Sequence, residues 1–143
     1  MSYSAPPSKG KVISGGYKVY PSAANGITPP NAASAWANGA YSEVVASTAE
    51  AIYITHISVS LDGSGAEAEI DIATGGSGSE IIVGTVTCGI PNVTDIGYVI
   101  QLPFVIEVAA STRISVRMRE SGTGLTVEQV RLMYVEKDSV APL

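Results

Sequence analysis

The chain has very little of the residue types on which enzymes and secreted proteins commonly depend. Its 143 residues include one cysteine and one histidine. The single cysteine, Cys88, cannot form a disulfide within the chain, and because it lies in a β-branched run we interpret it as a buried, inert thiol. No hydrophobic run approaches the ~20 residues that span a bilayer, and the N-terminal residues lack the apolar core of a signal peptide. We therefore expect no membrane partner and no passage through a secretory pathway.

The chain also has little charge. Charged residues make up 15% of it, and 8 basic against 13 acidic residues give a formal net charge of -5. Binding to the phosphates of DNA or RNA depends on a basic field, so this balance argues against a nucleic-acid partner. Hydrophobic residues reach 45%, and so weakly charged a composition favours a protein that covers part of its surface with a partner.

Candidate catalytic groups are scarce. His56 is the only histidine, and Ser58 and Ser60 share its face of a predicted strand. Residues two apart on a strand lie ~6.5–7 Å from each other, too far for a hydrogen bond between short side chains. No Gly-x-Ser-x-Gly nucleophile elbow accompanies them. We therefore expect no enzymatic activity and interpret His56 as a surface or interface residue.

Groups that could hold a metal or a cofactor are equally scarce. Glu67, Glu69 and Asp71 alternate with apolar residues in "AEAEIDIAT", and carboxylate oxygens suit Ca²⁺, but their spacing along a strand is too wide for one ion. We interpret them as an acidic strand face. The "GGSGS" at residues 75–79 lacks the Lys-Ser/Thr end of a P-loop, and no helix follows it. The sequence predicts neither a metal site nor a cofactor.

Residues 1–40 differ from the rest of the chain. Five of the eight prolines fall there, among Ser, Ala, Gly and Asn, which excludes a long helix and discourages central strands. Four aromatic side chains are costly to leave in water and predict a segment that packs along something. We interpret residues 1–40 as an extended N-terminal arm and its aromatics as anchors, with a sugar-stacking platform as the alternative. These anchors are Tyr17, Tyr20, Trp36 and Tyr41.

Residues 41–137 show period-two hydrophobic patterns separated by turn signals, with no apolar period of 3.6 residues. About eight strands at this spacing predict an all-β fold, a jelly-roll-like β-sandwich, followed by a C-terminal tail at 138–143. Residues 80–88 read as a strand buried on both faces, and Pro103 as the separator of two strands. A phase change near Glu128 and Gln129 predicts either a bulge in the last strand or a switch between sheets there. The strand candidates are 41–47, 50–61, 66–74, 80–88, two within 96–110, 112–120 and 125–136.

The segment "TRISVRMRE" places Arg113, Arg117 and Arg119 on one face of one strand. Three guanidinium groups at alternating positions repel one another unless carboxylates come between them. We expect them to meet the acidic face of Glu67, Glu69 and Asp71, either within the chain or on a neighbouring copy, so that all six are candidate subunit-contact residues. The alternative is a solvated strand face that protects an edge.

Three segments carry a resemblance to a known group of proteins. They are "GGSGSEIIVGTV", "YVIQLPFVIEVAASTRISVRMRESG" and a final "VRLMYV" strand. The pattern of a Gly-rich turn ending in Glu, an "LPF"-type segment and a "TRI…R" strand resembles small β-sandwich structural proteins in the virions of tailed bacteriophages. The match spans roughly residues 36–135.

The resemblance implies a capsid decoration (cement) protein, made in the cytoplasm of a bacterial host and located on the capsid surface. Its partners would be the major capsid protein and further copies of itself, as a homodimer or homotrimer. The alternative is a tail-associated or fibre module that binds a receptor or glycan on the host surface. The loops at 89–95 and 121–124 contain no aromatic residue, which disfavours sugar recognition.

Overall fold

The computed structural model describes residues 11–13, 16–22, 25–63, 66–90, 96–122 and 125–142. The regular secondary structure of the described residues is almost entirely strand, and none of their helical residues form a helix long and apolar enough to cross a membrane. The elements are β1 (Lys11–Ile13), β2 (Lys18–Tyr20), β3 (Ser42–Val45), β4 (Ile52–Gly63), β5 (Ala66–Thr74), β6 (Ile81–Ile90), β7 (Ile96–Val108), β8 (Ile114–Glu120), β9 (Leu125–Glu136), a 3-10 helix (Lys137–Ser139) and β10 (Val140–Pro142).

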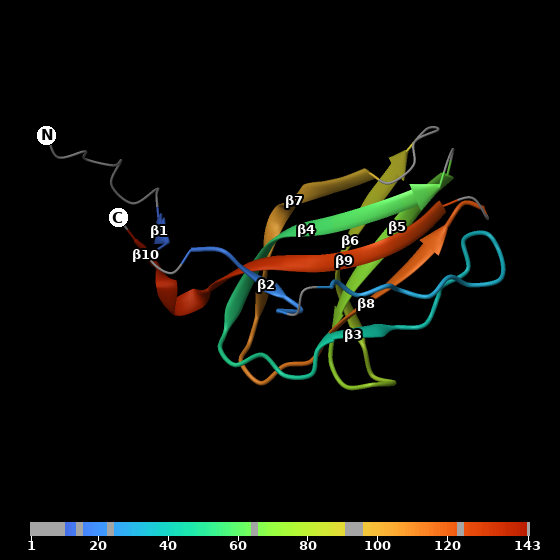
Figure 1. The fold of residues 1–143 in the computed structure, drawn as a ribbon. Coiled ribbons are helices and arrows are strands. Elements are labelled where there is room, and N and C mark those ends of the chain that lie inside the picture. The colour runs from blue at the N-terminus through green and yellow to red at the C-terminus, as the bar shows by residue number, and fades with distance from the viewer. Residues whose placement is uncertain are drawn as a thin grey trace, which may run out of the picture.

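Eight of the strands form two antiparallel four-stranded sheets, with the orders β2-β9-β4-β7 and β3-β8-β5-β6. The two sheets face each other as a β-sandwich (Figure 1), which confirms the predicted fold class. Successive strands alternate between the sheets except at β5 and β6, which are hydrogen-bonded neighbours. We interpret this order of eight strands as jelly-roll-like.

The core lies between the sheets and is built from alternating positions. In β5, Ala68, Ile70 and Ile72 are fully buried, as the alternation in "AEAEIDIAT" predicts. Each fully buried aliphatic side chain of this size contributes roughly 1.5–3 kcal/mol relative to an exposed one. The largest buried side chains come from both sheets: Ile52, Ile54, Ile57, Val59, Leu61, Ile70, Ile72, Ile114, Val116, Met118 and Leu132.

Two irregularities in the strands were expected from the sequence. Between β4 and β9 the register shifts, with Ser60 opposite Gln129 and Leu61 opposite Val127. Glu128 is therefore the extra residue, which confirms the bulge predicted there. Around Pro103 the chain does not divide into two strands: β7 continues through it, and a register shift opposite Thr55 absorbs residues 102–105. That prediction of two strands is wrong.

The described part of the predicted arm lies against its own chain. β2 pairs with β9, and Ile27 bridges Val130 in both directions. Farther on, the amide of Trp36 donates to the Glu120 carbonyl and the amide of Gly39 to that of Met118, after which β3 continues along β8. Residues 16–22 and 25–45 therefore cover the side of the sandwich formed by β9 and β8, which we call the closed side (Figure 1).

The two chain ends meet outside the sandwich. β1 pairs with β10 in a two-stranded ribbon of three residue pairs, separate from both main sheets. Figure 1 shows this ribbon standing away from the body. The predicted tail at 138–143 thus contains the end of the 3-10 helix and β10, while residues 1–10 of the predicted arm lie outside the described residues.

Candidate functional site

The arginines of β8 meet carboxylates of their own chain. Nε of Arg117 donates to Oδ2 of Asp71 at 2.8 Å, and a terminal nitrogen of Arg119 donates to the same oxygen at 2.7 Å. Arg119 also donates through Nε to Glu69 at 2.9 Å. The Thr85 hydroxyl donates to Oδ1 of Asp71 at 2.7 Å, so the Asp71 carboxylate joins β8 to β5 and β6.

Asp71 is fully buried although its strand position was expected to face outward. Burial raises its pKa, but the hydrogen bonds from Arg119, Arg117 and Thr85 outweigh burial and hold the pKa below its usual value. The guanidinium of Arg117 in turn lies over the aromatic ring of Tyr41, 4.8 Å from its centroid. A carboxylate enclosed in this way is a structural link and is not accessible to a substrate.

Arg113 has partners that the sequence did not predict. Its Nε donates to Glu43 at 2.9 Å, and a terminal nitrogen donates to Glu80 at 3.1 Å and to the Gly75 carbonyl at 3.2 Å. Glu67 is exposed, and none of the ion pairs among the described residues includes it. A role of these six residues in contacts between subunits stays a prediction.

The four predicted anchors divide into two pairs. Tyr20 stacks on Tyr134 with ring centroids 4.3 Å apart, and Tyr41 lies half-buried against Arg117. Tyr17 and Trp36 are about half exposed, at 52% and 44%. Tyr20 and Tyr41 thus attach the N-terminal segment to its own body.

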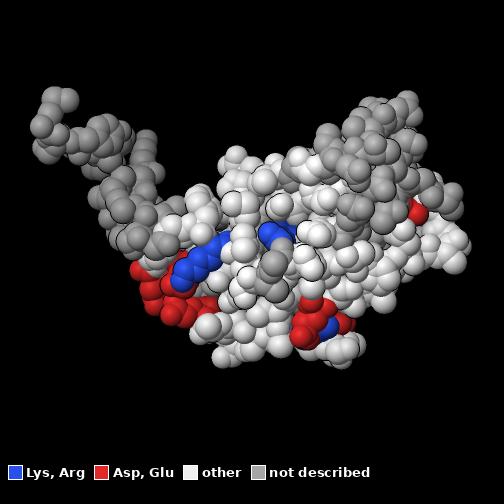
Figure 2. Space-filling model, in the orientation of Figure 1, with Lys and Arg blue, Asp and Glu red and all other residues white. Residues whose placement is uncertain are grey.

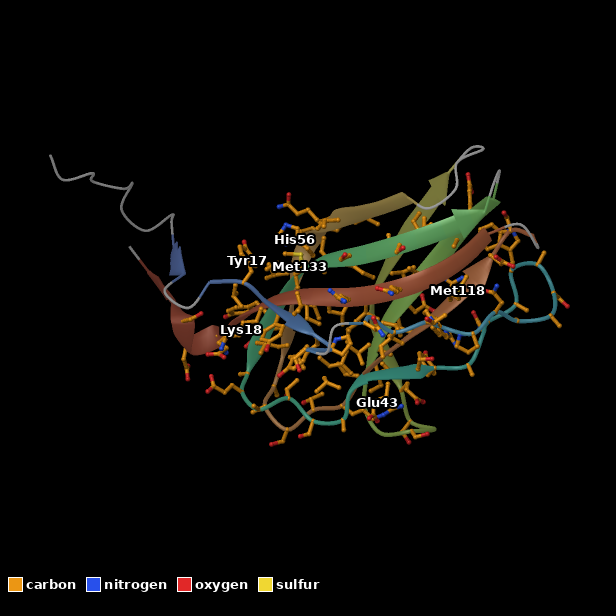
Figure 3. All side chains as sticks on the ribbon, in the orientation of Figure 1. Tyr17, Lys18, Glu43, His56, Met118 and Met133 are labelled. Carbon is orange, nitrogen blue, oxygen red and sulfur yellow. The ribbon has the colours of Figure 1, made fainter. Side chains whose placement is uncertain are left out.

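His56 contacts one polar and one aromatic side chain. Its Nδ1 is 2.8 Å from the hydroxyl of Thr55, and the ring of Tyr17 meets it edge-on at a centroid distance of 5.6 Å (Figure 3). Within the described ranges, no three His, Cys, Asp or Glu side chains gather so that they could hold a metal ion.

The side of the sandwich opposite the N-terminal segment is formed by the edges of β6 and β7, and we call it the open side. Large apolar side chains are exposed there: Phe104 is 83% exposed, Ile81 68% and Val105 58%. Val99 of β7 and Ile82 and Val83 of β6 are also exposed. The expectation that residues 80–88 are buried on both faces is therefore wrong; only Val86 and Cys88 of that strand are buried.

Bulges in both edge strands shape the open side. In β6 the register shifts at Val83, and in β7 it shifts between Gln101 and Ile106. The side chain of Ile106 fits against Gly84, where a Cβ would lie only 2.8 Å from its Cδ1. Beside this contact lies an open, mainly apolar depression of about 360 Å³, lined from both strands.

Charge is sparse on the molecular surface. Figure 2 shows one face, on which acidic and basic side chains form small groups separated by wide uncharged areas. β6 itself contains no charged residue over its ten positions. The open side can therefore form an extensive contact with little cost of removing charges from water.

Comparison with known proteins gives little further guidance. Neither a protein-family model nor a curated protein matches the chain. Among solved structures, a chain in "Structure of infectious bursal disease virus Gt strain" is similar with a TM-score of 0.40 and 12% identity, over 88% of this chain and 31% of that one. At this TM-score the similarity supports no conclusion about function.

One feature of the sequence indicated the open side, although the hydrophobicity of the same residues suggested a buried strand. Ten consecutive residues of β6 carry neither charge nor proline, which is unusual for a strand at the edge of a sheet. Glu43 and Glu80 as partners of Arg113 had no comparable signal, because they depend on which strands become neighbours.

Proposed function

We propose that this chain is a virion structural protein, a capsid decoration protein that binds and joins major capsid subunits of a tailed bacteriophage. The observation that supports it is the open side, where Phe104, Val105 and Ile81 expose apolar surface on an otherwise complete sandwich. Exposed large apolar side chains gathered on one side are typical of proteins that bind a neighbour there. The resemblance to phage virion proteins in the β6–β8 sequence agrees with this role.

In this proposal the chain attaches to the capsid through its N-terminal end. Residues 16–22 and 25–45 belong to the closed side, so the segment that can reach another protein is shorter than the sequence suggested. The β1–β10 ribbon has only three residue pairs and stands off the body. A two-stranded ribbon is marginally stable in water on its own, so a capsid surface beneath it would stabilise it.

Counting copies on separated virus parts tests the proposal. Heads and tails of the phage that encodes the chain would be purified separately, and the protein quantified in each by mass spectrometry. A decoration protein is present in hundreds of copies on heads without tails. Its presence on tails alone would replace the proposal with the tail or fibre module, and its absence from both would overturn it.

A deletion tests the attachment. Removing residues 1–13 takes away β1, which pairs only with β10 and with neither main sheet. The deleted chain should keep its circular dichroism and lose its binding to heads that lack the protein, in a sedimentation assay. Exchanging the exposed Ser47 for Ala in the full chain is the matched control and should bind normally. Unchanged binding of the deleted chain would contradict attachment through this end.

A further inference from the structure

The four edge strands of the two main sheets are protected to very different degrees. β2 and β3 are short, with three and four residues, and β3 carries Glu43. β7 contains Pro103 and a wide bulge, and proline at an edge removes a hydrogen-bond donor. β6 has ten residues with no charge and no proline, and its register with β5 is unbroken from Gly84 to Ile90.

An edge such as that of β6 is a template for another strand. Its outer backbone N–H and C=O groups have no neighbouring strand in the described chain, because β6 pairs only with β5. Folded proteins that stay monomeric block such edges with charge, proline, short length or covering segments. β6 has a single small bulge at Val83 and, among the described residues, none of the other devices, which favours a partner strand along it.

A second copy of β6 fits this edge. Two identical strands that pair antiparallel are related by a two-fold axis. Each strand then donates and accepts the same backbone hydrogen bonds as its partner, and the contact is complete with two copies. Because β6 is uncharged, its own copy brings no like-charge repulsion. Thr85 and Thr87 are exposed on its outer face, and β-branched pairs across strands are favourable.

We propose that β6 pairs antiparallel with β6 of a second copy, which joins two β3-β8-β5-β6 sheets into one continuous eight-stranded sheet across a two-fold axis. The apolar side chains at Ile81, Ile82 and Val83 then lie within or beside the contact. This inference rests on the edge strand and the side chains around it and does not require the proposed function.

The size of the contact agrees with a dimer. A ten-residue strand is about 34 Å long, and a sandwich side about 20 Å thick then offers about 700 Å² per copy. A standard specific interface buries about 800 Å² per partner. The edge is therefore large enough for a specific dimer interface.

Two lysines on β6 test the proposal. In the variant Ile82→Lys/Thr87→Lys both changed residues are exposed, so the fold should persist while the facing copies repel each other. Analytical ultracentrifugation should give twice the chain mass of 14.7 kDa for the natural protein and 14.7 kDa for the variant, with equal circular dichroism. The control Ser47→Lys/Ala49→Lys adds the same charges after β3, at the opposite edge of the sheet, and should remain a dimer.

Three results would overturn the proposal. They are a natural protein that stays monomeric at about 100 µM, a trimer, and a dimer that the β6 lysines leave intact.

A disulfide scan is an independent test, in which single cysteines replace Ile82, Val83 and Thr87 in a Cys88→Ala background. A disulfide needs Cα atoms about 4.4–6.8 Å apart, so only a position next to the two-fold axis should cross-link two copies. A natural protein that is monomeric and still binds to heads would show that this inference fails while the proposed function holds.

Discussion

The closed and open sides of the sandwich differ in whether the chain itself covers the edges of the two sheets. On the closed side, residues 16–22 and 25–45 give β9 and β8 neighbours through backbone bonds, and Tyr20 and Tyr41 pack on the sheets. On the open side, no described segment covers β6 or β7, and Phe104 projects almost fully into solvent. The N-terminal segment thus covers one side of the sandwich, while the other side keeps exposed edge strands and exposed apolar side chains.

From this difference we expect the closed side to determine the stability of the fold and the open side to determine association. Substitutions on the closed side and at its buried ion cluster should change the free energy of unfolding. Substitutions on the open side should leave that free energy nearly unchanged and alter association instead.

The largest loss of stability is expected for Asp71→Ala. Asp71 holds Arg117 and Arg119, and Tyr41 of the closed side rests on Arg117. Removing one partner from a buried ion cluster costs about 3 kcal/mol or more. Urea unfolding followed by circular dichroism should show the loss as a lower midpoint at an unchanged slope. Glu67→Ala, an exposed carboxylate on the same strand, is the matched control and should lose less than about 0.5 kcal/mol.

The same cluster has a pH signature. The folded state holds the pKa of Asp71 below its unfolded value, so its contribution is complete above about pH 4 and is lost as pH falls through the folded pKa. The stability difference between the natural protein and Asp71→Ala should therefore shrink on acidification. A difference that grows toward acid pH would contradict the assigned role of the carboxylate.

A direct comparison of the two sides uses one aromatic residue from each. Tyr20→Ala removes the ring stacked on Tyr134 and should cost about 2 kcal/mol, because it leaves a gap over a buried partner. Phe104→Ala removes a larger exposed area and should change the unfolding free energy by less than about 0.5 kcal/mol. Equal losses from the two substitutions, measured by the same unfolding curves, would remove the distinction between the sides.

The sequence predicted the sandwich because alternation fixes which face of each strand is apolar, as in β5. The same alternation placed Arg117 and Arg119 on the face that meets Asp71 and Glu69. It could not show that Asp71 would be buried, since that depends on two guanidinium groups closing over it.

The sequence misplaced the apolar surface for a physical reason. A run such as Ile81–Val83 is equally apolar whether a second sheet or a second molecule covers it, and only the sheet order makes β6 an edge. In the same way, the composition of residues 1–40 predicted packing without identifying the surface, which for residues 16–22 and 25–40 is their own body.

The closed side itself contains one group whose burial is unfavourable, the carboxylate of Glu120. Glu120 is buried where Trp36 joins β8, its main-chain oxygen accepts the Trp36 amide at 2.6 Å, and Oε2 of its carboxylate has no partner among the described residues. Burial raises the pKa of Glu120, so the folded state binds its proton more tightly than the unfolded state. Stability from this group is then present at low pH and is lost as pH rises through the folded pKa.

Glu120→Gln should accordingly stabilise the protein by about 1 kcal/mol at pH 7 and by progressively less as pH falls toward about 4. Thermal unfolding at several pH values measures this gain, with the exposed Glu67→Gln as a control that should show none. If the substitution destabilises the protein at pH 7, then Glu120 has a partner that binds its charged form. Such a result would mean that the closed side contains a favourable ion pair at Glu120 and no unfavourable buried charge.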